Sequence, residues 1–333
     1  MAFDVRRVVT GHDSAGNPVI VSDGAPARVI DAPNGFAVSD LYWLDGHATD
    51  AAAGGDPSDG PFVLEPPPGG VSVRIIRFPG NAPGTPVDDH WVRVGGDDPD
   101  RPGMHTTDTL DFMVVLDGEI VLGLDDGEHR LGPGDTVIQR GTPHRWRVAG
   151  EHPCTYATCL IRTEPDAPPP AVDLAPAAES AVAGGPRRLV TATDRDGRSY
   201  VLSDGPAASV FQPAGPDGVT MVELWQTGGR VLRPDQGGDP PGAWELEPRG
   251  RGIAFRYVEM PPGTDPGEAG WHTTDTIDLD LVLSGRIELA LPGVEPVVVG
   301  PWESVVQRAT NHRWRTVGDE PVRFVALMLA LGD

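Results

Sequence analysis

The stretch that decides the fold occurs twice, as HTTDTLDFMVVLDG at residues 105–118 and as HTTDTIDLDLVLSG at residues 272–285. Each copy alternates polar and apolar residues and ends at a Gly, a pattern that is typical of a β-strand followed by a turn. Other short apolar runs, separated by Gly, Pro or Asp-Gly, repeat this rhythm with little helical periodicity. We therefore expect an all-β chain of antiparallel barrels or jelly rolls, which close off the strand edges.

The repetition extends along the whole chain. RRVVTGHDSAGNPVIVSDG from residue 6 matches RRLVTATDRDGRSYVLSDG from residue 187 at an offset of 181. TVIQRGTPHRWRV from residue 136 likewise matches SVVQRATNHRWRT from residue 304. Two similar domains are therefore predicted, at residues 1–162 and 187–333. The Pro- and Ala-rich segment 163–186 between them has no periodic pattern and is interpreted as an extended linker.

The composition narrows the class of partner. The 333 residues include 49 acidic and 26 basic side chains, a formal net charge of −23, which disfavours nucleic acid and anionic membranes. The hydrophobic share of 39% is too large for a disordered chain. No run approaches the roughly 20 apolar residues that a membrane span needs, and the start lacks an apolar signal core. These features predict a cytoplasmic protein.

Strand geometry places several polar side chains on one face. Because successive residues of a strand point to opposite faces, His105 and Asp111 share a face in the first copy. On the partner segment, His144 and Trp146 also share a face. If both segments are barrel walls, we expect His105, Asp111 and His144 to converge inside the barrel.

These residues resemble the motifs of the cupin superfamily, G-x5-H-x-H-x3,4-E-x6-G followed by G-x5-P-x-G-x2-H-x3-N. More closely, the chain looks like the small cupins of the conserved-barrel type that carry H-x-T-x-T-x-D and a later Q-R-G-T-x-H-x-W, here duplicated into a bicupin. The resemblance implies two jelly-roll barrels in tandem, related by an internal pseudo-twofold. It also implies a divalent metal and a small organic substrate inside the barrel.

The chain departs from the family pattern at several positions. Thr replaces the second His of the first motif, Asp replaces Glu, and Gln stands where the second motif has Pro. Two His and one carboxylate per barrel remain, which is the ligand count of a non-haem iron facial triad. The predicted metal ligands are His105, Asp111, His144, His272, Asp278 and His312. Fe(II) is the favoured metal, with Mn, Ni or Zn as alternatives, and the opposing interpretation is a polar barrel core that holds no ion.

Further residues are candidates for the site. Gln139, Gln307 and Asp280 are candidate additional ligands, and Asp280 brings a second carboxylate to the position that Met113 occupies in the first copy. The expected substrate pocket consists of Thr107, Met113, Trp146, Thr274, Trp314 and His90. His90 belongs to an insertion within residues 80–104, which is present only in the first copy and is expected near the barrel mouth.

Three functions stay open at this point. The most concrete is a dioxygenase-like oxidoreductase, because two His and one carboxylate leave coordination sites for substrate and dioxygen. The second is a metal-dependent isomerase, decarboxylase or cyclase, and the third is a barrel that binds a small molecule without metal or catalysis. The resemblance also implies intramolecular pairing of the two barrels, in a monomer or a homodimer. In such a pair, the RRVVT and VIVSDG hairpin of each half can cross onto the other barrel.

Overall fold

The computed structural model describes residues 3, 5–56, 62–86, 90–94, 97–163, 185–207, 209–215, 217–231, 233–239, 244–248 and 250–332. The predicted linker lies almost entirely outside these residues. The described chain is nearly all β, as the sequence predicts, and its helix η2 (Gly267–Gly270) is a short 3₁₀ turn. No helix among the described residues has the length and apolar character that crossing a bilayer requires.

The first barrel consists of an eight-stranded sheet and a three-stranded sheet. In order across the larger sheet, the strands are β13 (Ser199–Pro206), β12 (Arg187–Thr193), β9 (Thr136–Arg140), β6 (Thr109–Asp117), β11 (Cys154–Arg162), β5 (Val71–Phe78), β4 (Ala37–Leu44) and β3 (Val29–Asp31). The smaller sheet has the order β10 (Arg145–Val148), β7 (Ile120–Leu124) and β8 (Gly127–Leu131). The two sheets enclose one apolar core.

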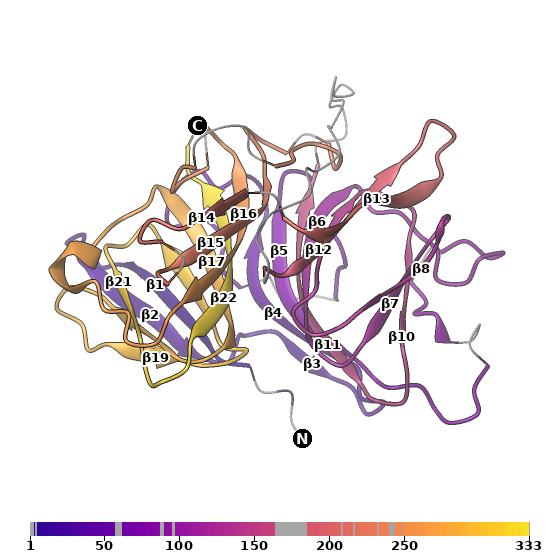
Figure 1. Cartoon of the computed structure of the whole chain (residues 1–333), viewed down its shortest axis with the longest axis horizontal. Helices are drawn as coiled ribbons and strands as arrows, with labels where there is room; N and C mark the ends of the chain where they lie inside the picture. Colours follow the sequence, from indigo (N-terminus) through magenta and orange to yellow (C-terminus); the bar gives the residue numbers. More distant parts are fainter. Residues whose placement is uncertain are drawn as a thin grey trace.

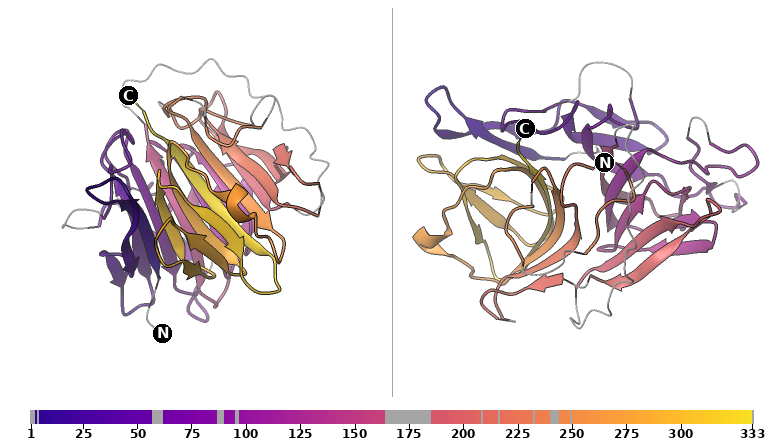
Figure 2. Two further views of the ribbon diagram at one scale, coloured as in Figure 1. Left: turned by 90° about the vertical axis from the view of Figure 1, so that its left-hand side faces the viewer. Right: turned by 90° about the horizontal axis from the view of Figure 1, so that it is seen from above.

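The second barrel has the same construction. Its larger sheet has the order β14 (Ser209–Phe211), β15 (Thr220–Gln226), β16 (Ile253–Met260), β22 (Val322–Ala330), β17 (Thr276–Ser284), β20 (Ser304–Arg308), β1 (Arg7–His12) and β2 (Pro18–Gly24). Its smaller sheet has the order β19 (Val297–Val299), β18 (Ile287–Ala290) and β21 (Arg313–Thr316). The barrels lie side by side, each with its own core (Figure 2).

The two halves exchange their first hairpins. β1 and β2 of the first half join the sheet of the second barrel, whereas β12 and β13 of the second half join the sheet of the first (Figure 1). Each exchanged hairpin is attached through a parallel pair, β1 with β20 and β12 with β9. The crossing that the repeat allows is therefore confirmed. Each barrel combines strands from both halves of the sequence.

Alternation along β6 shows how one strand serves two cores. Leu110, Phe112 and Val114 point to a core between the barrels that contains residues of both halves. Met113 and Val115 point to the core inside the first barrel. This division follows from the two-residue period of a strand, and it places Asp111 on the inner face with Met113, as the sequence predicts.

The insertion of the first half packs on the outside of the barrel. Trp91 is buried against the guanidinium groups of Arg145 and Arg147, at 3.9 and 5.3 Å from the ring centroid. Val92 lies beside β10 and donates its backbone amide to the carbonyl of Trp146 at 2.8 Å. The indole of Trp91 therefore covers the outer face of β10.

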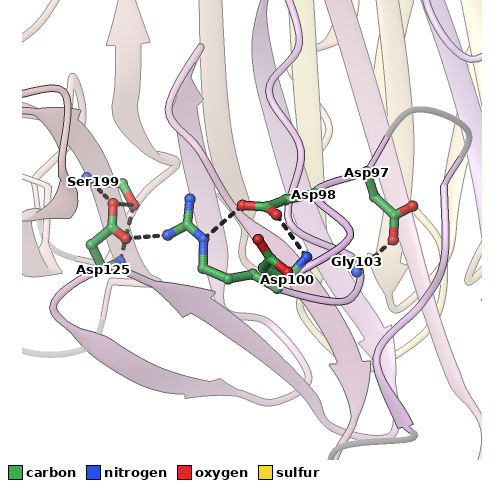
Figure 3. Close-up of polar contacts among 7 residues, drawn as sticks. Asp97, Asp98, Asp100, Gly103, Asp125 and Ser199 are labelled. Atoms are coloured by element: carbon green, nitrogen blue, oxygen red, sulfur yellow. Dashed lines mark hydrogen bonds and ion pairs between the residues drawn. The ribbon is translucent and has the colours of Figure 1, made fainter.

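Acidic residues tie the end of the insertion to its surroundings (Figure 3). Asp98 and Asp125 both accept hydrogen bonds from Arg101, at 3.0 and 2.6 Å. Asp125 also accepts a hydrogen bond of 2.8 Å from the backbone amide of Ser199, which belongs to the exchanged hairpin. The insertion is thus connected to a segment of the other half of the chain.

Candidate functional site

The histidines that the two motifs supply lie next to each other in each barrel. His105 and His144 form an isolated antiparallel bridge, with backbone hydrogen bonds of 3.0 and 2.9 Å, and their ring centroids are 4.3 Å apart. His272 and His312 repeat this bridge, with ring centroids 4.2 Å apart. The structure therefore brings the predicted histidines together in pairs.

Backbone carbonyls hold one nitrogen of each imidazole. The Nδ1 atoms of His105 and His144 lie 2.8 and 2.9 Å from the carbonyl oxygens of Gly103 and Thr142. In the second barrel, Nδ1 of His272 and His312 contact the carbonyls two residues earlier, both at 2.9 Å. A carbonyl accepts only a protonated Nδ1, so Nε2 carries the lone pair. None of the hydrogen bonds among the described residues engages Nε2 of these four histidines.

The insertion reaches this site through Gly103. Asp97 accepts a hydrogen bond from the backbone amide of Gly103 at 2.7 Å (Figure 3). The carbonyl of Gly103 accepts in turn from Nδ1 of His105. Gly103 has a φ of 80°, and a Cβ added there would lie 2.6 Å from the carbonyl oxygen of Val92. Only glycine fits this position, and its backbone places the carbonyl within hydrogen-bond distance of Nδ1 of His105.

Burial keeps the inner histidine of each pair neutral. His144 is 4% exposed, and burial together with the nearby His105 lowers its pKa to about 3. Burial and His272 lower the pKa of His312 to about 4. At neutral pH both side chains are uncharged imidazoles, which is the form that ligates a metal.

The predicted carboxylate ligands are buried on the inner face of the central strands. Asp111 lies opposite Gln139 in the pairing of β6 with β9, and Asp278 lies opposite Gln307 in the equivalent pair. Burial raises the pKa of Asp111 to about 7, and burial also raises the pKa of Asp278. The Oδ1 atoms of both aspartates are buried without a hydrogen-bond partner among the described residues.

The carboxylates are not gathered with the histidines. Within the part of the chain that the structure describes, no group of three His, Cys, Asp or Glu side chains lies close enough to hold a metal ion. The histidine pairs are assembled, whereas the complete sets of two His and one Asp stay a prediction. The partnerless Oδ1 of Asp111 leaves an acceptor free in the barrel.

The glutamines hold the turn that carries the inner histidine. Gln139 donates Nε2 to the carbonyl of Thr142 at 3.1 Å and also contacts its hydroxyl. Gln307 makes the same contacts with Thr310. Its Nε2 lies 2.9 Å from Nδ1 of His312, and with Nδ1 protonated both nitrogens donate to the carbonyl of Thr310. Of the two roles that the sequence allows, ligand or partner of the backbone, the described contacts correspond to the second.

The threonines of the first motif are buried and bonded locally. Thr109 donates to Thr107 at 2.8 Å, and Thr276 donates to Thr274 at 2.8 Å. Thr274 also donates to Asp278 at 3.2 Å. These hydroxyls therefore satisfy one another on the inner face, next to the strand that carries the carboxylate.

The two barrels differ where the sequence predicts. Met113 packs in the core of the first barrel. Asp280 is its counterpart, and this side chain is 8% exposed. Burial and the neighbouring Asp278 raise the pKa of Asp280 well above its usual range. The second barrel thus contains two neighbouring buried carboxyl groups, and their mutual repulsion opposes ionisation of both.

The tryptophans border the histidine pairs. Trp146 meets His144 edge to face, with centroids 5.9 Å apart, and Trp314 meets His312 at 5.8 Å. Both indoles also pack against the barrel cores. His90 is partly buried, and its Nε2 has no hydrogen-bond partner among the described residues. No contact among these residues links it to the pocket, so its role stays a prediction.

Sequence reasoning missed a buried ion pair in each barrel. Arg74 lies 2.9 Å from Asp40, and both side chains are at most 1% exposed. Arg256 lies 2.9 Å from Glu223, with exposures of 3% and 1%. Burial raises the pKa of Asp40, and it raises that of Glu223 to about 7. The sequence feature that could have indicated these ion pairs is an Arg at matching positions of two apolar strands, VSVRIIRF and IAFRYVEM.

Comparisons with known proteins agree with this architecture. The model of the cupin domain matches residues 90–160. The chain is 38% identical over 145 residues to phomopsin biosynthesis cluster protein C′ of Diaporthe leptostromiformis, which covers 42% of this chain and 69% of that protein. It is 30% identical over 169 residues to a cupin-domain-containing oxidoreductase of Neurospora crassa, covering 49% of this chain and 76% of that one.

Among solved structures, AerE from Microcystis aeruginosa superposes with a TM-score of 0.47 at 9% identity, over 92% of this chain and 97% of that one. The family assignment depends on the sequence relatives, since the Neurospora protein is matched over more than two thirds of its length. The repeated motifs extend the assignment to the second half. This chain belongs to the cupin superfamily, and it carries two barrels of that family in one polypeptide.

Proposed function

We propose that the chain is an oxidoreductase that binds a small organic molecule inside its barrels and oxidises it with dioxygen at a divalent metal. The observation that carries the proposal is the histidine pair. Two imidazoles lie 4.3 Å apart, and both have Nδ1 on a backbone carbonyl. Metal-binding histidines typically donate their second ring nitrogen to a carbonyl in this way. Three curated relatives, including the Neurospora protein, are themselves named as oxidoreductases.

The donor atoms at the pairs fit a first-row metal. Imidazole suits Fe, Ni and Zn, and the predicted ion would be held through Nε2 of His105 and His144, or of His272 and His312. Asp111 and Asp278 are proposed as the carboxylate ligands of the two barrels, although the structure does not gather either of them with its histidine pair. When bound, such an ion supplies Lewis acidity and, as iron, electron exchange with dioxygen.

The chain itself supplies the environment of the reaction. Trp146 and Trp314 each present an indole next to a histidine pair, which suits a planar or partly apolar substrate. Burial raises the pKa of Asp111 to about 7, so this carboxyl group would give up its proton when it binds the ion. The low pKa of His144 keeps that imidazole from competing for the same proton.

A second candidate function is favoured by one difference in the second barrel. Asp278 and Asp280 are both buried, and their mutual repulsion opposes ionisation of both. A carboxylic acid beside a carboxylate suits proton transfer to and from a substrate. We therefore propose a non-oxidative isomerase, decarboxylase or cyclase as the alternative for this barrel.

Elemental analysis by mass spectrometry tests the metal. The protein is purified without an affinity tag or chelator, beside His144→Ala, His312→Ala and the double variant, with His152→Ala as the control on an exposed side chain (69%). The proposal expects one or two equivalents of iron, manganese, nickel or zinc, lost barrel by barrel in the site variants and retained in the control. No metal in any preparation, and none taken up from anaerobic Fe(II), would leave a barrel that only binds a ligand.

Oxygen uptake separates the two chemistries. With a turned-over substrate, the oxidative proposal expects dioxygen consumption that matches product formation. Product formation under anaerobic conditions, lost in Asp280→Met, would instead assign the reaction to proton transfer in the second barrel.

A further inference from the structure

A buried threonine enters each barrel from the other half of the chain. Thr191 belongs to β12, which the second half adds to the first barrel, and its side chain is 0% exposed. The parallel register of β12 with β9 pairs Val190 with Ile138. Thr191 therefore follows the last paired residue and lies beside the turn that leads to His144.

The hydroxyl of Thr191 takes part in a chain of hydrogen bonds that begins at Gln139. Gln139 donates to the hydroxyl of Thr142, which donates to the hydroxyl of Thr191 at 2.9 Å. The hydroxyl of Thr191 donates in turn to the carbonyl of Ile138 at 3.4 Å, and it accepts a hydrogen bond from the backbone amide of Arg140 at 3.1 Å. Every donor in this chain has an acceptor, so the hydroxyl of Thr142 is held in one orientation.

The same turn holds the inner histidine. The carbonyl of Thr142 accepts Nδ1 of His144 at 2.9 Å. This carbonyl accepts only from a protonated Nδ1, so the position of Thr142 matters to the tautomer of His144. Between Thr191 and the imidazole there is one residue, Thr142.

The second barrel repeats the arrangement with the halves reversed. Thr10 belongs to β1, is 0% exposed, and contacts the hydroxyl of Thr310 at 2.9 Å. The amide of Arg308 donates to Thr10 at 3.0 Å, and the carbonyl of Thr310 accepts Nδ1 of His312 at 2.9 Å. The two sites thus share this arrangement, although Gln307 also lies 2.9 Å from Nδ1 of His312.

We propose that Thr191 and Thr10 are positioning residues that each half supplies to the site of the opposite barrel. Each hydroxyl fixes the turn before the inner histidine, so that His144 and His312 stay protonated at Nδ1 and keep Nε2 for a ligand. Neither site is complete without the other half of the chain. The inference relies on the proposed function only in treating these histidines as the working groups.

Valine tests the hydroxyl, because it has the shape of threonine without the hydrogen bonds. Long-range ¹H–¹⁵N spectra of the imidazoles are recorded on the full-length, chelator-treated protein, with His144→Ala and His312→Ala for assignment. Thr191→Val should convert His144 from the single Nδ1–H tautomer to a mixture and leave His312 unchanged. Thr10→Val should change His312 alone, and serine at either position should restore the wild-type spectrum.

Thr136→Val is the matched control. Thr136 is equally buried, and it connects the same two strands, β9 and β12. Its hydroxyl donates to the carbonyl of Arg187 at 3.0 Å, at the end of the strand pair that lies away from the histidine. It should leave both tautomers unchanged. An unchanged His144 in folded Thr191→Val, or an equal change in Thr136→Val, would overturn the inference. Thr191→Ala provides the same readout if the valine variant does not fold.

Metal content distinguishes this inference from the proposed function. If the ion binds as proposed, Thr191→Val should weaken its affinity in the first barrel about 10- to 100-fold and leave the second barrel unchanged. Tautomer changes in a protein that takes up no metal would support the positioning role and contradict the metal proposal. Metal uptake with unchanged tautomers would support the metal proposal and contradict the positioning role.

Discussion

Phe112 of the first half stacks on Phe255 of the second, with ring centroids 4.9 Å apart and 19° between the ring planes. Both side chains belong to the apolar core between the barrels, which contains residues from both halves. The barrels are therefore joined by a packed core as well as by the exchanged hairpins. This joint core makes their stabilities interdependent.

Truncation of Phe112 should destabilise the whole chain. Phe112→Ala removes a fully buried ring, and such changes cost about 3–5 kcal/mol in the free energy of unfolding. We expect both barrels to unfold in one transition at lower denaturant, measured by circular dichroism and tryptophan fluorescence together. Val21→Ala, at a side chain that is 57% exposed, is the control. Loss of one barrel with the other intact would contradict a shared core.

Separate halves should not fold alone. A fragment of residues 1–175 keeps β1 and β2 without the sheet they join, and it lacks β12 and β13 from its own barrel. We expect it to be insoluble, and co-expression with residues 176–333 to restore a soluble complex. Size-exclusion chromatography and circular dichroism provide the measurement. A soluble, well-folded and monomeric fragment would show that the exchange is dispensable.

Asp111 should make stability depend on pH in a defined direction. Its pKa is about 7 in the folded chain against 3.8 in the unfolded one, so between these values only the folded chain keeps the proton. Stability therefore falls as pH rises from about 4 to about 7, by roughly 4 kcal/mol at most for three pKa units. Asp111→Asn removes this loss. Urea unfolding of chelator-treated protein should show the variant gaining stability over wild type between pH 5 and pH 8.

The control for this change lies in the same motif. Asp108 is 77% exposed, so Asp108→Asn alters a carboxylate in water. If Asp108→Asn gained as much stability over wild type between pH 5 and pH 8, or if Asp111→Asn gained none, burial of Asp111 would not be the cause of the pH dependence of stability.

The buried pair of Arg74 and Asp40 should behave as a coupled unit. Arg74→Met leaves the carboxylate of Asp40 buried with only the more distant Arg28, at 3.8 Å, as a cationic partner. Loss of one partner of a buried ion pair typically costs about 3–5 kcal/mol. The double variant with Asp40→Leu should recover much of this loss, because two apolar side chains replace two charges. A double-mutant cycle of urea midpoints measures the coupling. Additive effects of the two changes would mean that the pair does not interact.

Local pattern was enough to predict the faces of the strands. Alternation separated Phe112 from Met113, and the structure places them in different cores, because the side-chain period of a strand is fixed at two. The repeat predicted two equivalent barrels and allowed the hairpin exchange. The histidine pairs were also predictable, since each motif supplies one histidine to the same barrel.

Depth along the barrel was not predictable in this way. His105 and Asp111 share a face, but six residues of extended chain span up to about 20 Å, so a common face does not imply a common site. The pairing of Arg74 with Asp40 was missed for a related reason. Partners that lie on neighbouring strands are found only when the register of the sheet is known.

The hairpin exchange sets an order for biosynthesis. Thr10 is translated 297 residues before Gln307, the residue it contacts in the second barrel. Domains usually fold as they emerge, starting from the N-terminal one. Here the first barrel has to wait for β12 and β13, while β1 and β2 emerge from the ribosome with no sheet to join. Of the strands that the structure describes, β1 and β2 are translated first but are among the last to reach their final neighbours, and their open edges need protection until then.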